Sequence, residues 1–278
     1  WQKFGAVDNI EIHFSTNGGV SYPDGDYPAG NRIYSGPSNI NPQGADFTFP
    51  WDVPDRIGNN VMIRIRHREN TNVKNDPDLV KAFRIKGKLV LTQPENGGIS
   101  WTVGSTPKIQ WVSTGTFTPV ELHYSRYGTF GAGDVFVVKP NSTVTNCTPQ
   151  VGQITCNGEA NFEIEDQISA GAKVRIRGTG TESDVQYIST NAFKIVGALD
   201  VTAPESGQVW YVGEANKNIT WDASGTIPNV NIGYKTSFAG ACNYTNIVAA
   251  NGGHTSGSNT YVWPNVADER TETAYICI

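Results

Sequence analysis

The sequence predicts an all-β chain of tandem antiparallel β-sandwich domains, about 110 residues per repeat, arranged as an extended rod. Two observations carry this prediction. Long phrases recur at a spacing of 110 or 111 residues, and short apolar–polar alternations separated by Gly- and Pro-rich breakers run along the chain. A unit of this length is the size of one small domain, whereas helical solenoid units are about 20–50 residues long.

The repeat is clearest around a recurring tryptophan. Trp1, Trp111 and Trp221 open the phrases WQKFGAVDNIEIHFS, WVSTGTFTPVELHYS and WDASGTIPNVNIGYK, which align without gaps. The phrases AFRIKGKLVLTQP and AFKIVGALDVTAP recur in the same way, and so do MIRIR and KVRIR. Asp55 and Asp166 also correspond. Chance does not keep so many positions in register.

This spacing divides the chain into domains of residues 1–86, 87–196 and 197–278. We expect the first domain to lack its opening strands and the third its closing strand, and the chain to be a segment of a longer protein. The phrase AFRIKGKLVLTQP passes from a last strand into a first strand with only a glycine near the junction. Linkers this short limit bending, so we expect a stiff rod.

The alternation predicts which side chains face the core. In VELHY, Val120, Leu122 and Tyr124 are expected to point inward, and Glu121 and His123 outward. About seven such strands in each ~100 residues, with turn signals between them, predict an Ig-like (fibronectin-like) antiparallel sandwich. The repeated tryptophan is expected to anchor its core.

Composition excludes several classes of protein. The net charge is −5 and charged residues make up only 17 % of the chain, which argues against a nucleic-acid-binding protein with its basic patch. No apolar run approaches the ~18 residues of a spanning helix. The balance is typical of exposed, secreted β-rich modules.

The second and third copies share a longer motif, L-x-V-x-x-P-x-x-G-x-x-W-x-V-G, followed by I-x-W and G-x-x-x-x-V-x-I-x-Y-S, and the second closes in F-x-I. It is carried in the second copy by Val90, Pro94, Gly98, Trp101, Val103, Gly104, Ile109, Trp111, Gly115, Val120, Leu122, Tyr124, Ser125, Phe193 and Ile195. The third copy carries it in Val201, Pro204, Gly207, Val212, Gly213, Ile219, Trp221, Gly225 and Tyr234, but has Lys235 in place of Ser.

This motif resembles the Ig-like repeats of the fungal cell-wall synthesis family, the Ser/Thr-rich GPI-anchored type. It is similar also to repeats of large prokaryotic surface proteins. The resemblance covers nearly the whole chain and implies an extracellular, wall- or surface-associated setting. It supplies no catalytic residues.

The four cysteines fall into two pairs. Cys147 and Cys156 flank the turn-rich segment CTPQVGQITC, so we expect a disulfide across this hairpin, in keeping with an oxidising compartment. Cys242 and Cys277 could form a second bridge from a loop to the AYICI strand, but sequence alone does not set that geometry. Free thiols, or partners outside this chain, are the alternative.

Asn-x-Ser/Thr tripeptides mark possible glycosylation sites at Asn141, Asn146, Asn218 and Asn243. Asn218 lies just before Trp221 on a predicted strand, so a glycan there requires that Asn218 face outward. The tripeptide is also common by chance in an Asn- and Thr-rich chain.

Two arginines project from one strand in each of the first two copies, beside a glutamate on the strand expected next to it: Arg64, Arg66 and Glu11, and Arg175, Arg177 and Glu121. They could form an anion-binding stripe or cross-strand ion pairs worth roughly 0.2–1 kcal/mol each. The third copy has Asn231 for the glutamate and Cys277 for an arginine. Both charges are lost together, which favours ion pairing.

Metal and ligand sites have weaker signals. Asp24 and Asp26 in PDGD, and Asp76 and Asp78 in NDPD, offer clustered oxygens of the kind calcium prefers. Turn chemistry explains both segments as well, so calcium is a weak candidate, and no other cofactor is implied. His13 and His123 occupy the same position in two copies and are expected to be surface strand residues, too far apart to share a metal.

Candidate ligand-contacting aromatics lie in the loops that differ between copies: Tyr22, Tyr27 and Tyr34 in the first, and Phe130 in the second. Exposed aromatics there could stack on sugars or on a neighbouring chain.

No catalytic constellation is present, since the chain has neither a G-x-S-x-G elbow nor H-E-x-x-H. We therefore expect not an enzyme but a structural or adhesive repeat array of a cell-surface, sheath or filament protein, located outside the cell. The alternative is a carbohydrate-binding accessory region of a large secreted enzyme. The expected partners are further copies of the repeat, neighbouring subunits, or cell-wall or surface polysaccharide, and not nucleic acid or a membrane-spanning segment.

Overall fold

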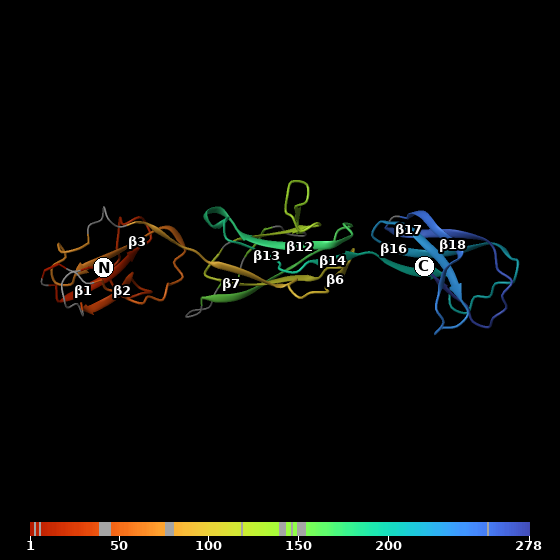
Figure 1. Cartoon of the computed structure of the whole chain (residues 1–278), viewed down its shortest axis with the longest axis horizontal. Helices are drawn as coiled ribbons and strands as arrows, with labels where there is room; N and C mark the ends of the chain where they lie inside the picture. The colour runs from red at the N-terminus through yellow and green to blue at the C-terminus, as the bar shows by residue number, and fades with distance from the viewer. Residues whose placement is uncertain are drawn as a thin grey trace.

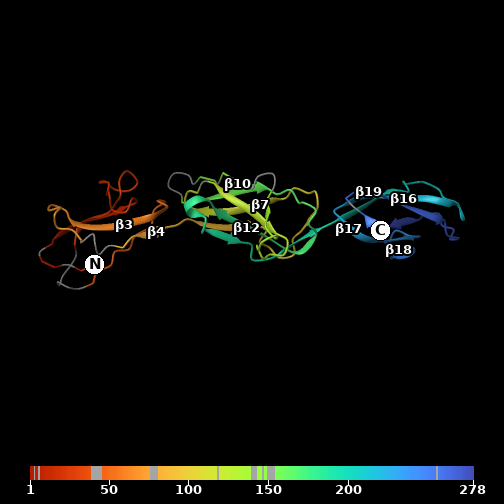
Figure 2. The ribbon, with the colours of Figure 1, turned by 90° about the horizontal axis from the view of Figure 1, so that it is seen from above.

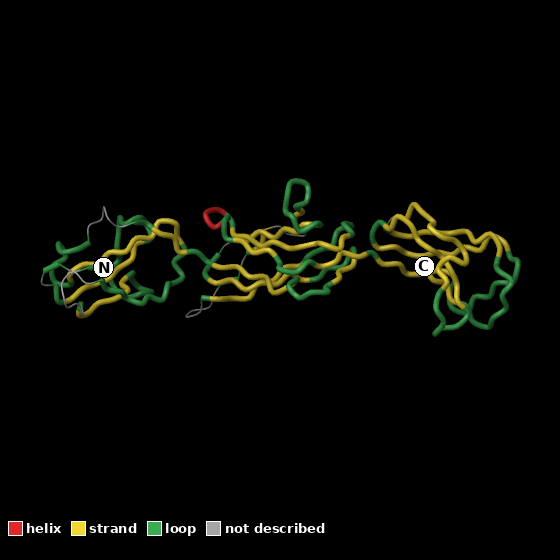
Figure 3. Tube along the Cα trace, viewed as in Figure 1, coloured by secondary structure: helices red, strands yellow, loops and turns green. Residues whose placement is uncertain are grey.

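The computed structural model describes residues 1–278 apart from 3, 6, 39–45, 76–80, 118, 139–142, 146, 149–153 and 255. The described residues form strands, turns and one turn of 3-10 helix, η2 (Gly180–Glu182). Three β-rich lobes follow one another in a row, as Figure 1 shows from one side and Figure 2 from above. The strands, yellow in Figure 3, run broadly along the row. The prediction of tandem antiparallel sandwiches in an extended arrangement is confirmed.

The first lobe is built on one four-stranded sheet with the order β2-β1-β3-β4. Its strands are β1 (Asn9–Ser15), β2 (Arg32–Pro37), β3 (Gly58–His67) and β4 (Phe83–Ile85). Phe14 and Val61 are fully buried, and Trp51 packs on Phe14 with ring centroids 5.5 Å apart. Trp1 is only half-buried and lies in no strand, so the tryptophan expected as the core anchor has that role only in the other two copies.

The middle lobe has the two sheets of an Ig-like sandwich. One sheet has the order β11-β7-β5 and the other β10-β8-β12-β14-β6, with β9 and β13 at its side. The strands are β5 (Lys88–Gln93), β6 (Ser100–Thr102), β7 (Lys108–Thr114), β8 (Val120–Ser125), β9 (Phe136–Val137), β10 (Thr143–Val144), β11 (Thr155–Asn161), β12 (Ser169–Gly178), β13 (Gln186–Ile188) and β14 (Phe193–Val196).

The core of the middle lobe follows the predicted alternation. Val120, Leu122 and Tyr124 are all completely buried. Trp111 is also buried and lies against the neighbouring strand at Gly158, where a Cβ would come within 2.3 Å of the indole. Glycine at this position therefore makes room for the anchor side chain.

The third lobe repeats the arrangement with two three-stranded sheets, β15-β16-β19 and β18-β17-β20. Its strands are β15 (Ala198–Ala203), β16 (Ala215–Ser224), β17 (Ile227–Lys235), β18 (Asn243–His254), β19 (Gly257–Asn265) and β20 (Tyr275–Cys277). Trp221 is fully buried, as Trp111 is in the middle lobe.

Candidate functional site

Both predicted cysteine pairs form disulfides. Cys147 bonds to Cys156 of β11, with Cα atoms 5.9 Å apart. Cys242, in the connection between β17 and β18, bonds to Cys277 of β20, with Cα atoms 6.4 Å apart. The second bridge, which the sequence left open, therefore joins a loop to the last strand of the third lobe.

The cross-strand ion pairs that the sequence favours are present. Glu11 lies opposite Arg66, with 2.8 Å between Oε2 and Nη2, and Glu121 lies opposite Arg177, with 2.6 Å between Oε2 and Nε. Although burial opposes it, hydrogen bonds from Arg66 and His13 hold the pKa of Glu11 below its usual range. Glu11 is therefore a charged partner of the neighbouring strand.

The expectation that the polar face of these strands is exposed is wrong for the first copy. His13 is completely buried and Glu11 is 6 % exposed. The loop between β1 and β2 covers this face. In it, the Tyr22 ring stacks on the Arg64 guanidinium, with 4.1 Å between Cζ and the ring centroid. Burial lowers the pKa of the His13 imidazole, and that of His123 in the middle lobe, because a dry environment disfavours the charged ring.

The candidate ligand-contacting aromatics contact the protein itself. In the middle lobe, Phe130 stacks on Arg175 at 4.7 Å, which repeats the pair of Tyr22 with Arg64. Tyr34 packs on Phe49 with ring centroids 5.0 Å apart, and Tyr27 is 42 % exposed with Arg56 5.3 Å from its ring. These side chains do not make one exposed platform.

The acidic loop residues of the first copy also have arginine partners. Asp24 contacts Arg66 and Asp26 contacts Arg32, each at 2.8 Å. Asp76 and Asp78 lie outside the described residues, and the described part contains no cluster of three or more His, Cys, Asp or Glu suited to a metal. Calcium binding stays a prediction without structural support.

Two of the glycosylation candidates, Asn218 of β16 and Asn243 of β18, are exposed. Asn218 thus meets the requirement that it face outward. Asn141 and Asn146 lie outside the described residues, and all four sites stay predictions.

The same hydrogen-bonded contact is found at both junctions between lobes. Only residues 86–87 separate β4 from β5, and only Gly197 separates β14 from β15. At the first junction, Asp55 accepts hydrogen bonds from the Thr116 backbone N–H at 3.0 Å and from its hydroxyl at 2.6 Å. At the second, Asp166 accepts the same two bonds from Thr226, at 2.9 and 2.5 Å. We call this arrangement the Asp–Thr contact.

A glycine before each threonine lets the lobes approach. Gly115 and Gly225 have φ values of +85° and +89°, which L side chains rarely adopt. A Cβ on Gly115 would come within 3.0 Å of Ile57 and 3.2 Å of Asp55. A Cβ on Gly225 would come within 3.2 Å of both Asp166 and Ile168. The two junctions are therefore built from corresponding residues of successive copies.

The first junction has an additional ionic contact. Arg84 of β4 donates to both carboxylate oxygens of Asp184, at 2.8 and 3.1 Å, and Lys86 also contacts this carboxylate. These partners hold the pKa of Asp184 well below its usual range. At the second junction the corresponding positions hold Lys194 and Val196, so one of the two cations recurs there.

The third lobe presents the acceptor half of the same contact. Ile164 exchanges backbone hydrogen bonds with residues 104–105, and Val266 does so with residues 213–214. Asp268, two residues after Val266, therefore corresponds to Asp166 and is exposed. Arg270 stands where the other junctions have isoleucine.

The recurrence of Asp55 and Asp166 is visible in the sequence, but the sequence does not indicate its role. The available signal was the Gly-Thr dipeptide at 115–116 and 225–226, which recurs with the aspartates. Whether this dipeptide contacts the aspartate depends on the distance between neighbouring lobes, and the spacing of the repeat does not specify that distance.

No helix among the described residues is long and apolar enough to cross a membrane. No family model and no curated protein matches the chain. Similar solved structures include a complex of Dpr2 Ig1-Ig2 with DIP-Theta Ig1-Ig3, at 9 % identity and a TM-score of 0.27, covering 93 % of this chain and 81 % of that one.

Drosophila OTK extracellular domains 3–5 match at 10 % identity and a TM-score of 0.27, covering 97 % of this chain and 83 % of that one. A marsupial T cell receptor matches at 11 % identity and a TM-score of 0.26, covering 100 % and 93 %. At TM-scores this low, none of these similarities carries a functional argument.

Proposed function

We propose that this chain is a structural array of Ig-like repeats in an extracellular surface, sheath or filament protein, and that the Asp–Thr contacts keep the array extended. The observation that carries the proposal is the repetition of this contact at both junctions. With linkers of one or two residues, a two-point hydrogen bond across each junction opposes bending.

Two further observations support the setting. Two disulfides, with no free cysteine among the described residues, are typical of an oxidising compartment. The repeat motif resembles that of the fungal cell-wall synthesis family and of large prokaryotic surface proteins, which implies a wall or surface location.

The proposed partner is a further copy of the repeat. Asp268 offers an exposed carboxylate of the kind that receives a Gly-Thr turn at the other two junctions. A second copy of this chain would present Gly5-Ala6 instead, which lacks the hydroxyl. The fitting neighbour therefore carries its own Gly-Thr or Gly-Ser turn.

Small-angle X-ray scattering of the purified chain tests the array. We expect a rod with a well-defined longest dimension, and a shorter average dimension in the double variant Asp55→Ala/Asp166→Ala. Circular dichroism should show that the strands of the variant are retained. A wild-type chain that bends as freely as the variant would contradict the proposal, and so would a folded variant with wild-type scattering.

A further inference from the structure

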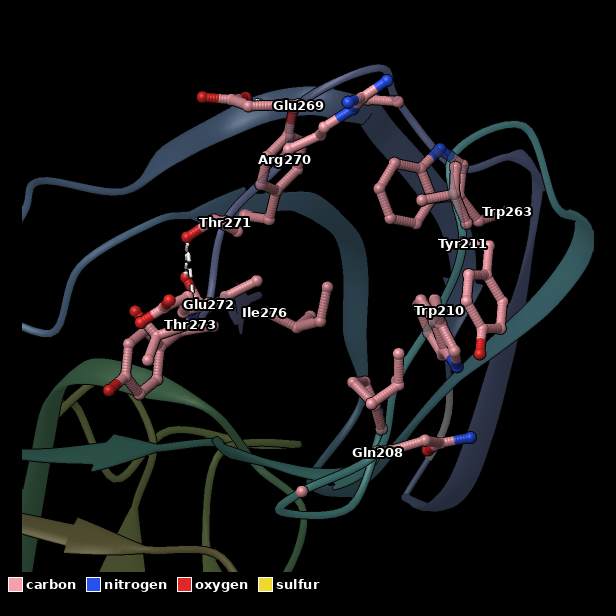
Figure 4. A pocket seen from close by; sticks show the side chains of 18 of the residues that line it. Gln208, Trp210, Tyr211, Trp263, Glu269, Arg270, Thr271, Glu272, Thr273 and Ile276 are labelled. Atoms are coloured by element: carbon pink, nitrogen blue, oxygen red, sulfur yellow. Dashed lines mark hydrogen bonds between the residues drawn. The ribbon is translucent and has the colours of Figure 1, made fainter.

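The third lobe contains a groove of about 1100 Å³ that neither of its two sheets covers. Residues 204–212 form one side and residues 269–276 the other. Figure 4 shows Gln208, Trp210 and Tyr211 along one wall, facing Thr271, Thr273 and Ile276 across the open space. We call it the third-lobe groove.

The middle lobe shows what occupies this place in the repeat. There β14 lies between β6 and β12, parallel to β6 and antiparallel to β12. Its side chains Phe193 and Ile195 are each 1 % exposed, and the Phe193 ring lies 4.6 Å from Trp101 and 6.4 Å from Phe162. The strand β14 is thus part of the core.

Both walls of the third-lobe groove correspond to the neighbours of β14. Trp210 corresponds to Trp101 in the shared motif G-x-x-W-x-V-G. On the other wall, Tyr275 pairs with Lys235 of β17 as Lys173 of β12 pairs with Ser125 of β8. Residues 271–274 therefore stand where β12 pairs with β14.

Burial shows that the position is unfilled. In the middle lobe, Tyr124, Ile164 and Val174 are at most 1 % exposed. Their counterparts in the third lobe line the groove and are only half-buried: Tyr234, Val266 and Ile276. Apolar side chains that are fully buried in one copy and only partly buried in the other mark a place for a partner.

We propose that the third-lobe groove binds an extended β-strand carrying the Phe-x-Ile pattern of β14. The strand runs parallel to residues 208–212 and antiparallel to residues 271–276. In the middle lobe, Lys194 N–H donates to Ile99 O at 2.9 Å, and Val103 N–H donates to Val196 O at 3.0 Å. The corresponding backbone groups of the groove are Gln208 C=O and Val212 N–H.

Side chains set the specificity, as they do when a strand adds to a sheet. The phenylalanine packs against Trp210 and Trp263, whose ring centroids lie 6.2 Å apart, as Phe193 packs against Trp101 and Phe162 in the middle lobe. The residue between the two apolar positions points away from the core, as exposed Lys194 does in β14.

The strand site requires only the third lobe, so its test is separate from that of the rod. The probe is a synthetic peptide with the sequence of residues 190–197, TNAFKIVG, added to the full chain. Isothermal titration calorimetry is expected to show one site. Hydrogen–deuterium exchange is expected to show protection at residues 208–212 and 271–276, with none gained at residues 99–103.

The matched control is the same peptide with Phe193→Asp and Ile195→Asp. It should bind at least about tenfold more weakly, because it loses the burial of two apolar side chains. A second measurement joins each peptide through a Gly-Ser linker after Ile278, where the native pattern should raise the melting temperature and the Asp pattern should not. Equal binding of the two peptides, or protection elsewhere, would overturn the proposal. So would the absence of any effect in both formats.

Discussion

The Asp55 carboxylate accepts both the backbone N–H and the hydroxyl of Thr116, at 3.0 and 2.6 Å, and so joins the first lobe to the second. The same pair of bonds joins Asp166 to Thr226 at the next junction. Because the backbone N–H and the hydroxyl of each threonine both donate to the carboxylate, the contact constrains the rotation of one lobe against the next as well as their separation.

Removing the threonine hydroxyl should loosen the first junction without unfolding either lobe. The variant Thr116→Val keeps the shape and the N–H but loses one bond to a charged, exposed acceptor, at a cost of about 1 kcal/mol. Spin labels on the first two lobes, read by double electron–electron resonance, should show a broader distance distribution. Thr116→Ser retains the hydroxyl and should stay close to wild type. Identical distributions for Val and Ser would contradict the role of the hydroxyl.

A methyl group on Gly115 should cost more than backbone strain alone. Alanine at φ +85° is disfavoured by about 1–2 kcal/mol, and its Cβ would also press on Ile57 at 3.0 Å. The control is Gly104→Ala in the same lobe, which has φ +82° but open space around the added Cβ. Urea unfolding should show the larger loss for Gly115→Ala. Equal losses would mean that the junction is not tight there.

The first junction should respond to salt and acid through Asp184. The Arg84 and Lys86 contacts with Asp184 are exposed and therefore screened by salt. Because the folded pKa of Asp184 is depressed, its contribution is present above the unfolded pKa of about 4 and is lost as the pH falls below it. Distance distributions across each junction at low and high salt will check this. Asp184→Asn should remove the salt dependence at the first junction, and a wild-type response to salt in that variant would be incompatible with it.

Stability should fall as the pH drops below about 6.5. The folded pKa values of His13 and His123 are lowered by burial, so the unfolded chain binds protons that the folded chain does not. The contribution of neutral histidine is therefore complete above the unfolded pKa and declines below it. Urea unfolding between pH 7.5 and pH 5 should show a smaller slope in the double variant His13→Asn/His123→Asn. If the unfolding free energy of this variant changed with pH as steeply as that of the wild type, groups other than these two histidines would bind the protons.

Some sites could be located from residue types and alternation alone. The pairing of Glu11 with an arginine of the neighbouring strand followed from two strands whose side chains alternate. The register of the ladder then decided that this arginine is Arg66 and not Arg64. The burial of His13 could not be foreseen. It depends on a loop that folds back so that Tyr22 covers Arg64, and loops do not have the period that makes strands readable.

The sequence by itself determined the unit of this protein: a strand-rich repeat of about 110 residues with almost no linker between copies. It also predicted a recurring tryptophan anchor, which holds for Trp111 and Trp221 but not for Trp1. Those features are local or periodic, and periodicity survives in a linear chain. Only the tertiary structure decided that Asp55 meets Thr116, residues 61 positions apart, and that the walls around Trp210 and Ile276 leave a strand-sized groove. Such contacts depend on how closely folded units approach, because hydrogen bonds and packing act over a few ångströms in space rather than along the chain.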